Sequence, residues 1–452
     1  MENLLEVISA LICQKKYSEV KEILSAENAA DLAGLFEALF GEDFEEQKEF
    51  IILFRLLPKD LAAETFVYMD SDMQEFLINA FSDVELREML AQSFIDDTVD
   101  IIEDMPANVV SRILKNSSTG ARKAINTILR YPKDSAGSIM TIEYVNLHKD
   151  MTVSEAFEKI RKVGVNKETI YTAYVTENRK LIGIVTVKDL FIAEEEDKIG
   201  DIMENNVISV TTHEDKEIVA NMFPKYDFLA IPVTDSEERL VGIVTFDDAM
   251  DVIQEKNTED VKMMAAIAPN DDAYFKTGVF SHAKSRIIWL LVLMLGATFT
   301  GIVTMQYENA FEAVPLLVSF MPMIMGTGGN SGSQSSTLII RGMALDEIKF
   351  KDFFKVIFKE FRVALIVSTV LALITGVGIY FIYDNSYLIA ITVSLSIILT
   401  IVAAKLIGVV LPMFAKKCGL DPALMASPLI TTIVDTCSML LYFNIATFML
   451  NI

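Results

Sequence analysis

The sequence predicts an α-helical membrane protein with two further domains on the cytosolic side, an α-helical superhelix and an α/β domain built from a tandem repeat. Three observations lead to this fold class. Residues 276–452 contain five apolar stretches of membrane-spanning length, residues 131–253 carry one α/β pattern twice, and residues 1–130 show the spacing of short amphipathic helices.

The N-terminal region, residues 1–130, is predicted to be an acidic domain of stacked short helices. Segments Leu56–Met69 and Asp104–Leu114 each contain a proline near the start and continue with apolar residues three and four positions apart. Proline is favoured in the first turn because an amide hydrogen there would have no helical partner. Similar helix openings recur along the region, which favours a superhelical array.

Acidic side chains are in excess before the membrane half. From Arg286 onward the chain has ten basic and nine acidic side chains, so the preceding 285 residues hold 29 basic and 54 acidic ones, a net charge of −25. Such a field repels nucleic acid and attracts cations. We therefore expect no nucleic-acid partner. An ordinary acidic surface explains the charge equally well, so charge alone does not establish a cation site.

Neither the cysteines nor the N-terminus suggest secretion. Cys13, Cys418 and Cys437 lack metal-ligand spacing, and their odd number argues against a disulfide framework. The first 14 residues are amphipathic and lack the basic region of a signal peptide. We therefore expect the soluble half to lie in the cytosol.

A pattern of short β-rich runs and helices occurs twice between residues 138 and 253. The matching segments are Ile139–Ile160 with Ile202–Phe223 and Leu181–Leu190 with Leu240–Ala249. Each copy has a strand pair that ends in Gly-Ile-Val-Thr and is followed by a helix, and in this it resembles a CBS (cystathionine β-synthase-type) domain. We expect a tandem CBS pair, with one domain at 131–199 and the other at 200–253.

A threonine and an aspartate three residues later recur where a strand meets a helix in each copy. The pairs are Thr186 with Asp189 and Thr245 with Asp248. This spacing predicts a capping box at the start of each helix. In CBS domains the same residue types can hold the phosphate and ribose of an adenine nucleotide, so the resemblance implies ATP or AMP binding as a second interpretation.

Residues 246–275 are predicted to form a helix that connects the repeats to the membrane half. Its first part carries six acids, Asp247, Asp248, Asp251, Glu255, Glu259 and Asp260. A solvated helix face explains them. The position of the helix would nevertheless let it pass movement of the cytosolic half to the membrane half.

Five apolar stretches each reach the ~20 residues that a bilayer helix requires. They lie at 287–305, 313–340, 361–383, 387–414 and 426–450. The loops near Glu308 and Asp384 carry no basic residue, so the positive-inside rule predicts a cytosolic N-terminus, five spans and an outside C-terminus in the cell (inner) membrane. Lys405 lies toward the cytosolic end of the fourth stretch and could snorkel to the interface, so we treat it as a helix-end residue.

The last apolar stretch carries one aspartate in its interior. Asp435 has no basic residue near it in the sequence. A charged group costs about 3 kcal/mol or more at membrane depth, so it persists mainly where it faces a bundle interior or a water-filled path. An unpaired acid there indicates a cation site and hence a cation transporter or channel.

The second apolar stretch contains a polar tract that lipid cannot solvate. Between Met321 and Gly342, four glycines alternate with hydroxyl and amide side chains. A glycine-mediated packing seam explains the glycines by themselves. Asn330 and Gln334 lie one helical turn apart and offer the oxygen ligands that Mg²⁺ prefers, which favours a pore lining.

Three segments resemble the MgtE family of magnesium transporters. Tyr131–Thr141 is similar to the entry to that family's CBS pair, and Gly326–Ala344 and Asp421–Thr436 are similar to its two membrane signatures. The resemblance covers nearly the whole chain. It implies a homodimer that conducts Mg²⁺ down its electrochemical gradient, channel-like, through a pore lined by the second and fifth spans.

In that pore, the resemblance implies that Asp435 of both copies holds a largely hydrated Mg²⁺. Mg²⁺ gives up its waters reluctantly, so two carboxylates with waters between them suit it. Thr431 and Ser427 lie one and two turns before Asp435 and add oxygen atoms on the same face.

The resemblance also implies a Mg²⁺ sensor in the acidic domains. Carboxylates repel one another when Mg²⁺ is scarce and are bridged when it is plentiful, which closes the pore. The implied positions are Asp248, Glu259 and Asp260, with Asp421 as the pore-side partner and Glu255 as a neighbour. Lys256 stands where another carboxylate is expected, so we expect it to weaken or shift one sensor site.

Several other functions compete with this one. An intramembrane aspartyl protease needs two interacting carboxylates, and the spans offer Asp435 without a Gly-x-Gly-Asp sequence, so we expect no enzyme. A nucleotide-gated channel, a less selective carrier of Co²⁺ or Mn²⁺, and a non-transporting receptor for divalent cations remain open. The residues do not decide between a channel and an ion-coupled carrier.

Overall fold

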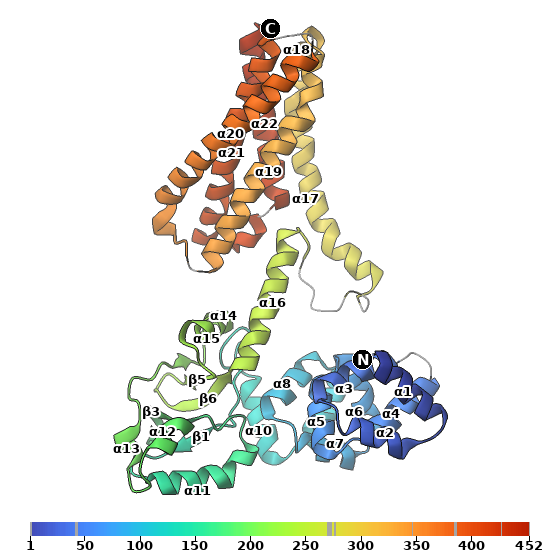
Figure 1. Ribbon diagram of the computed structural model, residues 1–452, viewed down its shortest axis with the longest axis vertical. Helices are drawn as coiled ribbons and strands as arrows, with labels where there is room; N and C mark the ends of the chain where they lie inside the picture. Colours follow the sequence, from blue (N-terminus) through green and yellow to red (C-terminus); the bar gives the residue numbers. More distant parts are fainter. Residues whose placement is uncertain are drawn as a thin grey trace. The chain divides into compact units, whose positions relative to one another are not determined.

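A computed structural model describes residues 2–40, 44–268, 274, 277–345, 347–383, 387–425 and 427–451. The chain divides into two units, Met1–Gln254 and Glu255–Ile452. The first holds short helices and two small sheets, and the second holds long helices (Figure 1).

The first part of unit one is the predicted domain of short helices. Prolines 58 and 106 directly precede two of them, as predicted. Each of several helices packs on the next but one, α3 on α5, α5 on α7 and α7 on α9, which confirms the stacked arrangement. The helices are α1 Glu2–Cys13, α2 Tyr17–Leu24, α3 Ala29–Leu39, α4 Phe44–Phe54, α5 Lys59–Val67, α6 Ser71–Ala80, α7 Asp83–Leu90, α8 Ile95–Asp104, α9 Ala107–Asn116 and α10 Thr119–Ile128.

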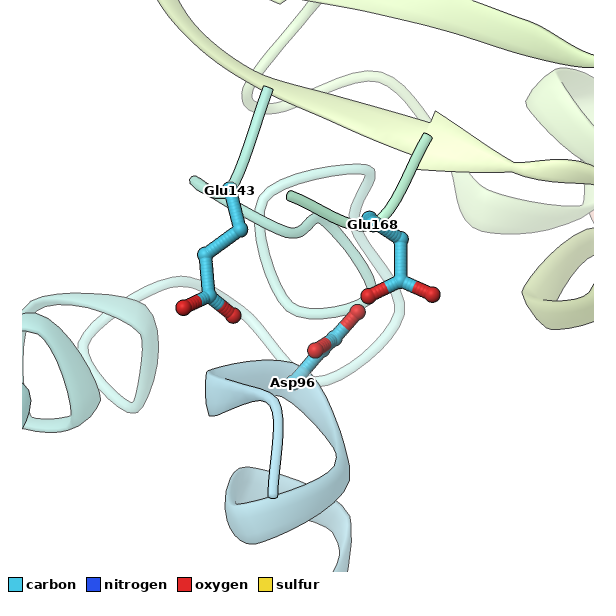
Figure 2. Close-up of side chains that lie close together, drawn as sticks. All are labelled: Asp96, Glu143 and Glu168. Carbon is cyan, nitrogen blue, oxygen red and sulfur yellow. The ribbon is translucent and has the colours of Figure 1, made fainter. Parts of the chain in front are cut away.

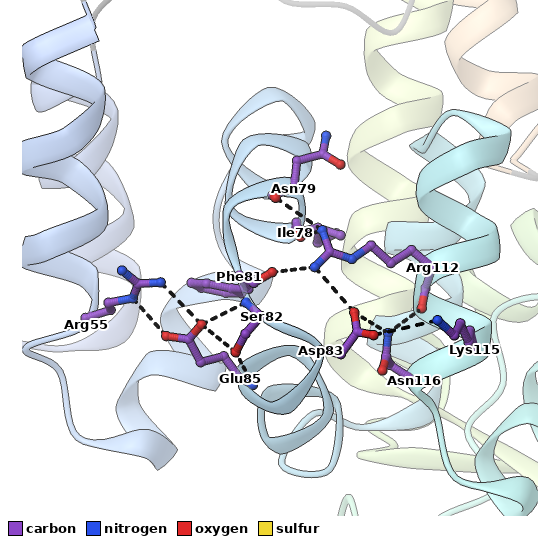
Figure 3. A network of polar contacts seen from close by, with 10 residues as sticks. All are labelled: Arg55, Ile78, Asn79, Phe81, Ser82, Asp83, Glu85, Arg112, Lys115 and Asn116. Atoms are coloured by element: carbon purple, nitrogen blue, oxygen red, sulfur yellow. Dashed lines mark hydrogen bonds and ion pairs between the residues drawn. The ribbon is translucent and has the colours of Figure 1, made fainter.

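Arg112 of α9 joins neighbouring helices of this stack (Figure 3). Its guanidinium donates to the carbonyl oxygens of Ile78 (2.6 Å), Asn79 (3.2 Å) and Phe81, and it lies 3.6 Å from Asp83. These carbonyls lie at the C-terminal end of α6, where they have no partner within the helix. The arginine therefore caps α6 and ties it to α9.

Two three-stranded sheets with the same topology form the tandem repeat. In each, the first strand pairs parallel with the second, and the second pairs antiparallel with the third. This confirms the predicted repeat. The strands are β1 Val145–Leu147, β2 Thr172–Glu177 and β3 Lys180–Thr186 in the first copy, and β4 Val210–Thr211, β5 Ala230–Thr234 and β6 Leu240–Thr245 in the second.

Short helices accompany the two sheets, and the longest helix of the region follows β6. The short ones are α11 Val153–Val163, η1 Gly164–Asn166, α12 Val187–Ile192, α13 Ile199–Ile202, α14 Lys216–Ala220 and α15 Met222–Tyr226. The longest, α16, spans Phe246–Met264 and corresponds to the predicted connecting helix 246–275. It ends before 275, and residues 269–273, 275 and 276 lie outside the described residues.

Long helices make up the second unit. α21 packs against α19, α20 and α22, and α22 also packs against α17 and α19. The elements are α17 Val279–Met305, α18 Glu308–Ala313, α19 Leu316–Ala344, η2 Phe350–Asp352, α20 Phe353–Ile382, α21 Tyr387–Lys417, η3 Pro422–Met425 and α22 Ser427–Leu450.

Four of the predicted spans are long and apolar enough to cross a membrane. They are Val279–Met305, Phe350–Ile382, Tyr387–Lys417 and Pro422–Leu450. The second predicted span corresponds to α19, which has 29 residues and carries the polar tract. Five spans therefore remain a prediction. Ala426, the first residue of the fifth predicted stretch, and Asp384, in the predicted outer loop, lie outside the described residues.

Lys405 does not snorkel, so that prediction is wrong. The residue is 4% exposed, and its Nζ atom lies 3.6 Å from Glu360 Oε2. Nζ also donates to Ser335 Oγ at 3.1 Å. An acid from the neighbouring helix α20 neutralises the lysine inside the bundle, so its ammonium has no need of the interface.

Candidate ion-binding sites

Asp435 lies in the interior of α22 and is half-buried. Its Oδ1 atom faces the backbone of α19, since a Cβ atom added to Gly329 would lie 3.7 Å from it. Within the described part of the chain, no lysine or arginine lies within ion-pair distance of Asp435. The fold therefore brings the acid to the polar helix without a counter-charge.

Glycines allow α19 to approach α22 and α21 closely. A Cβ atom on Gly328 would lie 2.7 Å from Ser438 Oγ, and one on Gly332 would lie 2.9 Å from Ile430 Cγ2. Side chains at these two positions would collide with the neighbouring helices. The packing seam considered from the sequence is therefore present.

The opposite face of α19 carries an exposed polar stripe. Asn330 and Gln334 are exposed, as are Gly326 before them and Thr337 after them. These positions repeat every three or four residues, so they share one side of the helix. Lipid cannot solvate the amides of Asn330 and Gln334, so this face requires water or protein beside it. The same helix thus has a seam on one side and a polar lining on the other.

Ser427 and Thr431 lie on the helix of Asp435, at its start and one turn before the acid. Both are partly exposed. The Thr431 hydroxyl donates to the Pro428 carbonyl at 2.9 Å, so its oxygen keeps lone pairs for a cation or a water. Among the described residues, no hydrogen bond joins Asn330 or Gln334 to Asp435.

A second group of predicted residues surrounds Lys256 in unit two. The Lys256 Nζ atom lies 3.1 Å from Glu259, 3.8 Å from Asp260 and 3.5 Å from Asp421. The structure therefore brings these three predicted sensor acids together, with an ammonium group among them. Glu255 precedes the lysine and is not one of these three partners.

A third acidic cluster lies in unit one, where α8 meets the loops that precede β1 and β2 (Figure 2). Carboxylate oxygens of Asp96, Glu143 and Glu168 all lie within 4.8 Å of one another. Glu143 Oε2 accepts a hydrogen bond from the Ile95 backbone N–H at 3.0 Å. In contrast, Asp96 Oδ1 and Glu168 Oε2 are buried without a hydrogen-bond partner among the described residues. Hard oxygen ligands without partners fit a divalent cation such as Mg²⁺.

The acids around this cluster hold their protons unusually tightly. Desolvation, followed by repulsion from Asp97, raises the pKa of Glu168 to about 8. Desolvation also raises the pKa of Asp97 to about 6 and that of Asp100 to about 7. Burial raises the pKa values of Asp96 and Asp248 well above the ordinary range; repulsion from Glu168 adds to the effect on Asp96, and repulsion from Asp96 adds to the effect on Asp248. The predicted sensor residue Asp248 thus belongs to this group.

Sequence reasoning missed Asp96, Asp97, Asp100, Glu143 and Glu168. Asp96 and Asp97 stand in the first turn of α8, where acids are expected because they favour the helix dipole, and Asp100 follows one turn later. The two glutamates belong to the loops that flank β1 and β2, far from α8 in the sequence. No spacing connects these segments, so the cluster becomes visible once the chain is folded.

The two threonine–aspartate pairs behave differently. At α12, Asp189 N–H donates to Thr186 Oγ1 (3.2 Å), and Thr186 N–H donates to Asp189 Oδ2 (3.1 Å), so the predicted capping box is present. At α16, the Thr245 hydroxyl lies 2.5 Å from Asp247 and 2.6 Å from Asp248. This hydroxyl is engaged by two acids at the edge of the acidic cluster.

These sites and this fold define a membrane transporter for divalent cations with an acidic helical domain and a CBS pair. Residues 321–445 match the family described as "Divalent cation transporter", residues 27–134 match the MgtE intracellular N domain, and residues 136–196 and 199–255 match the CBS domain. The chain belongs to the MgtE family. The resemblance stated from the sequence is thereby confirmed.

Proteins of known function support the assignment over almost the whole length. The chain is 33% identical over 437 residues to "Magnesium transporter MgtE" of Thermus thermophilus, which covers 96% of this chain and 95% of the relative. It is 35% identical to the Bacillus subtilis protein of that name over 78% of each chain. Among solved structures, it is similar to the cytosolic domain of the Mg²⁺ channel MgtE in complex with ATP, with TM-score 0.51 and 31% identity over 55% of this chain and 99% of that one.

Proposed function

We propose that this protein moves Mg²⁺ across the cell membrane down its electrochemical gradient, through a channel-like path that passes Asp435. The observation that carries the proposal is an acid without a counter-charge in a membrane helix, placed against the glycine seam of a polar helix. Such an acid is costly unless it serves a cation. The magnesium transporters to which the chain is similar support Mg²⁺ as the ion.

The proposed path lies between two copies of the chain. The stripe with Asn330 and Gln334 is exposed in a single copy, although α19 lies among membrane helices. A second copy would cover these amides with water and protein instead of lipid. It would also supply a second Asp435, and two carboxylates with retained waters suit a hydrated Mg²⁺. The positive-inside rule places the N-terminus in the cytosol and the C-terminus outside.

Regulation by internal Mg²⁺ is the second part of the proposal. The cluster of Asp96, Glu143 and Glu168, with Asp248 nearby, has buried oxygens without partners and would bind Mg²⁺. Bound Mg²⁺ would hold α8 against the CBS pair and relieve the repulsion between carboxylates. The path would then close when the cytosolic concentration of Mg²⁺ rises.

At the acids Glu259, Asp260 and Asp421, Lys256 would supply part of the positive charge. Its ammonium lies within 4 Å of all three carboxylates. We therefore expect Mg²⁺ to compete with a lysine there, so this site would depend less on Mg²⁺ than the cluster in unit one.

ATP is a second ligand for the CBS pair in this proposal. The supporting observation is the similarity to a cytosolic domain whose solved structure contains ATP. Thr245 and Asp248 would then serve both nucleotide and acidic cluster, so ATP and Mg²⁺ regulation would be coupled. Thr186 and Asp189 are the corresponding pair of the first copy, where each bonds the other at the start of α12.

Uptake of Mg²⁺ into proteoliposomes tests the proposal. With low internal Mg²⁺, wild type is expected to show uptake and Asp435→Asn to lose it, because the amide keeps the shape and removes the charge. Asp352→Asn is the matched control, since this acid lies in η2 at the very start of the candidate span Phe350–Ile382 and pairs with Lys355. Equal uptake by wild type and Asp435→Asn would refute the path. Preference for Co²⁺ or Mn²⁺ over Mg²⁺ would favour the less selective carrier.

A further inference from the structure

Three membrane helices meet at a charged network that the proposed ion path does not use. Glu360 of α20 and Lys405 of α21 are 9% and 4% exposed, and Ser335 of α19 is fully buried. The Ser335 hydroxyl donates to Glu360 Oε2 at 2.7 Å and accepts from Lys405 Nζ at 3.1 Å, and the two charges lie 3.6 Å apart. The three side chains therefore form a closed network of two charge-assisted hydrogen bonds, which meet at Ser335, and one ion pair.

Burying this network costs free energy that apolar packing between the same helices would not. Ionisable groups inside a membrane are costly, and replacing a buried ion pair by apolar residues is often neutral or even stabilising. Charged hydrogen bonds have a property that apolar packing lacks, because their strength depends on direction as well as distance. The two charge-assisted hydrogen bonds at Ser335 are therefore suited to fixing the orientation of α19.

The network acts on the part of α19 that carries the polar stripe. Ser335 directly follows Gln334, and the next residue, Ser336, donates from its hydroxyl to the Met425 carbonyl of η3 at 2.9 Å. Two adjacent serines thus bind α19 to α20 and α21 through one side chain and to η3 through the next. Gly332 and Gly408 bring α19 and α21 together nearby, where no larger side chain would fit. Rotation of α19 about its axis would break both contacts.

We infer that Ser335, Glu360 and Lys405 are positioning residues that fix the rotation of α19, so that Asn330 and Gln334 face the ion path. The role of this face in conduction rests on the proposed function, whereas the clamp itself rests on the contacts within unit two. The two are therefore separable by experiment. The clamp predicts a defined orientation of α19 whether or not Mg²⁺ is the ion that passes.

Cysteine accessibility in the full-length protein measures that orientation. In a chain with Cys13, Cys418 and Cys437 replaced by serine, Gln334→Cys reports on the polar stripe and Ser331→Cys, at a buried position, reports on the seam. A hydrophilic thiol reagent should modify the first much faster than the second. In the Glu360→Gln/Lys405→Met double variant, this rate ratio should fall toward one, because rotation of α19 would turn position 334 away from water and bring position 331 toward it.

Stability and transport are measured alongside. Each single variant leaves a buried charge unpaired and should lower the yield of folded protein, whereas the double variant should recover it. If the double variant is folded but keeps the wild-type rate ratio and the wild-type KM for Mg²⁺ uptake, the pair is merely structural and the inference is wrong. If the double variant does not fold, Ser335→Ala is used in its place, because this change keeps both charges and removes their hydrogen bonds to α19. An unchanged ratio of modification rates in Ser335→Ala also contradicts the inference. If the difference in modification rate is lost in the double variant, and Asp435→Asn does not change Mg²⁺ uptake, the clamp is supported and the proposed ion path is rejected.

Discussion

At the scale of single residues, the counter-charge beside each carboxylate sets what that carboxylate can bind. Among the described residues, Asp435 has no basic side chain within ion-pair distance, so its carboxylate is available to a passing cation. Asp421 shares an ammonium with two acids of α16. Asp96 and Glu168 have buried oxygens without partners and depend on protons or metal.

The ammonium of Lys256 is expected to reduce the repulsion among Glu259, Asp260 and Asp421. Lys256→Gln removes the ammonium from three carboxylates, so their repulsion should loosen α16 and the Asp421 turn when internal Mg²⁺ is low. A partly exposed ion pair contributes up to about 1 kcal/mol, which corresponds to roughly a fivefold rise in uptake at low internal Mg²⁺. Lys256→Arg keeps the charge and serves as the control. Identical dependence of uptake on internal Mg²⁺ in wild type and Lys256→Gln would contradict this role.

The acidic cluster predicts a dependence of stability on pH. Because the folded chain raises the pKa values of Asp97, Asp100 and Glu168 to about 6, 7 and 8, these groups bind protons more tightly when folded than when unfolded. Their contribution to stability is therefore fully present below the ordinary carboxyl pKa near 4 and is lost as pH rises through about 6 to 8.

Thermal unfolding of the cytosolic unit within the full chain measures this effect. Without Mg²⁺, the melting temperature should fall between pH 5.5 and pH 8, and Mg²⁺ should raise it more at pH 8, where protons no longer compete. Glu168→Gln should flatten both dependences. A melting temperature that rises with pH in Mg²⁺-free buffer would show that these carboxylates have another cation nearby.

The sequence predicted the individual acids better than their groupings. Asp435 was predictable because an acid in an apolar stretch is visible without a fold. Asp96, Glu143 and Glu168 come from three separate segments, so no local sequence pattern predicts that they lie together. Lys405 was misplaced for a related reason, since its position along a helix does not reveal that Glu360 of another helix lies beside it.

At the scale of elements, α19 combines two functions that the sequence left as alternatives. Its glycines form the seam with α21 and α22, and its amides form the exposed stripe. The sequence did predict this helix and its polar tract, because helical spacing is a local property. Which residues face the seam could not be predicted, since that depends on the side chains that neighbouring helices present.

The seam predicts unequal effects for two glycines of α19. A Cβ atom at Gly332 would lie 2.9 Å from Ile430 and 3.1 Å from the Ala404 carbonyl oxygen, whereas at Gly326 nothing lies within 4 Å. Gly332→Ala should therefore destabilise the membrane unit by about 1–3 kcal/mol through overpacking. Gly326→Ala should leave stability near wild type. Equal melting temperatures of the two variants in detergent would contradict the seam.

At the scale of the whole molecule, the chain joins an acidic unit with net negative charge to a membrane unit in which a polar helix has one uncovered side. In the proposed function, the acidic unit responds to internal cations, and a second copy of the chain covers the exposed side of α19. We therefore regard the transporting form as a pair of chains that share one ion path, with Asp435 contributed by each.

Co-reconstitution of wild-type and Asp435→Asn chains measures whether two copies share one ion path. If two copies share one path and both aspartates are needed, uptake of Mg²⁺ should follow the square of the wild-type fraction, so an equal mixture that pairs at random should retain about a quarter of the wild-type rate. If each chain conducts through its own path, the equal mixture should retain about half. A linear dependence on the wild-type fraction would contradict the shared path.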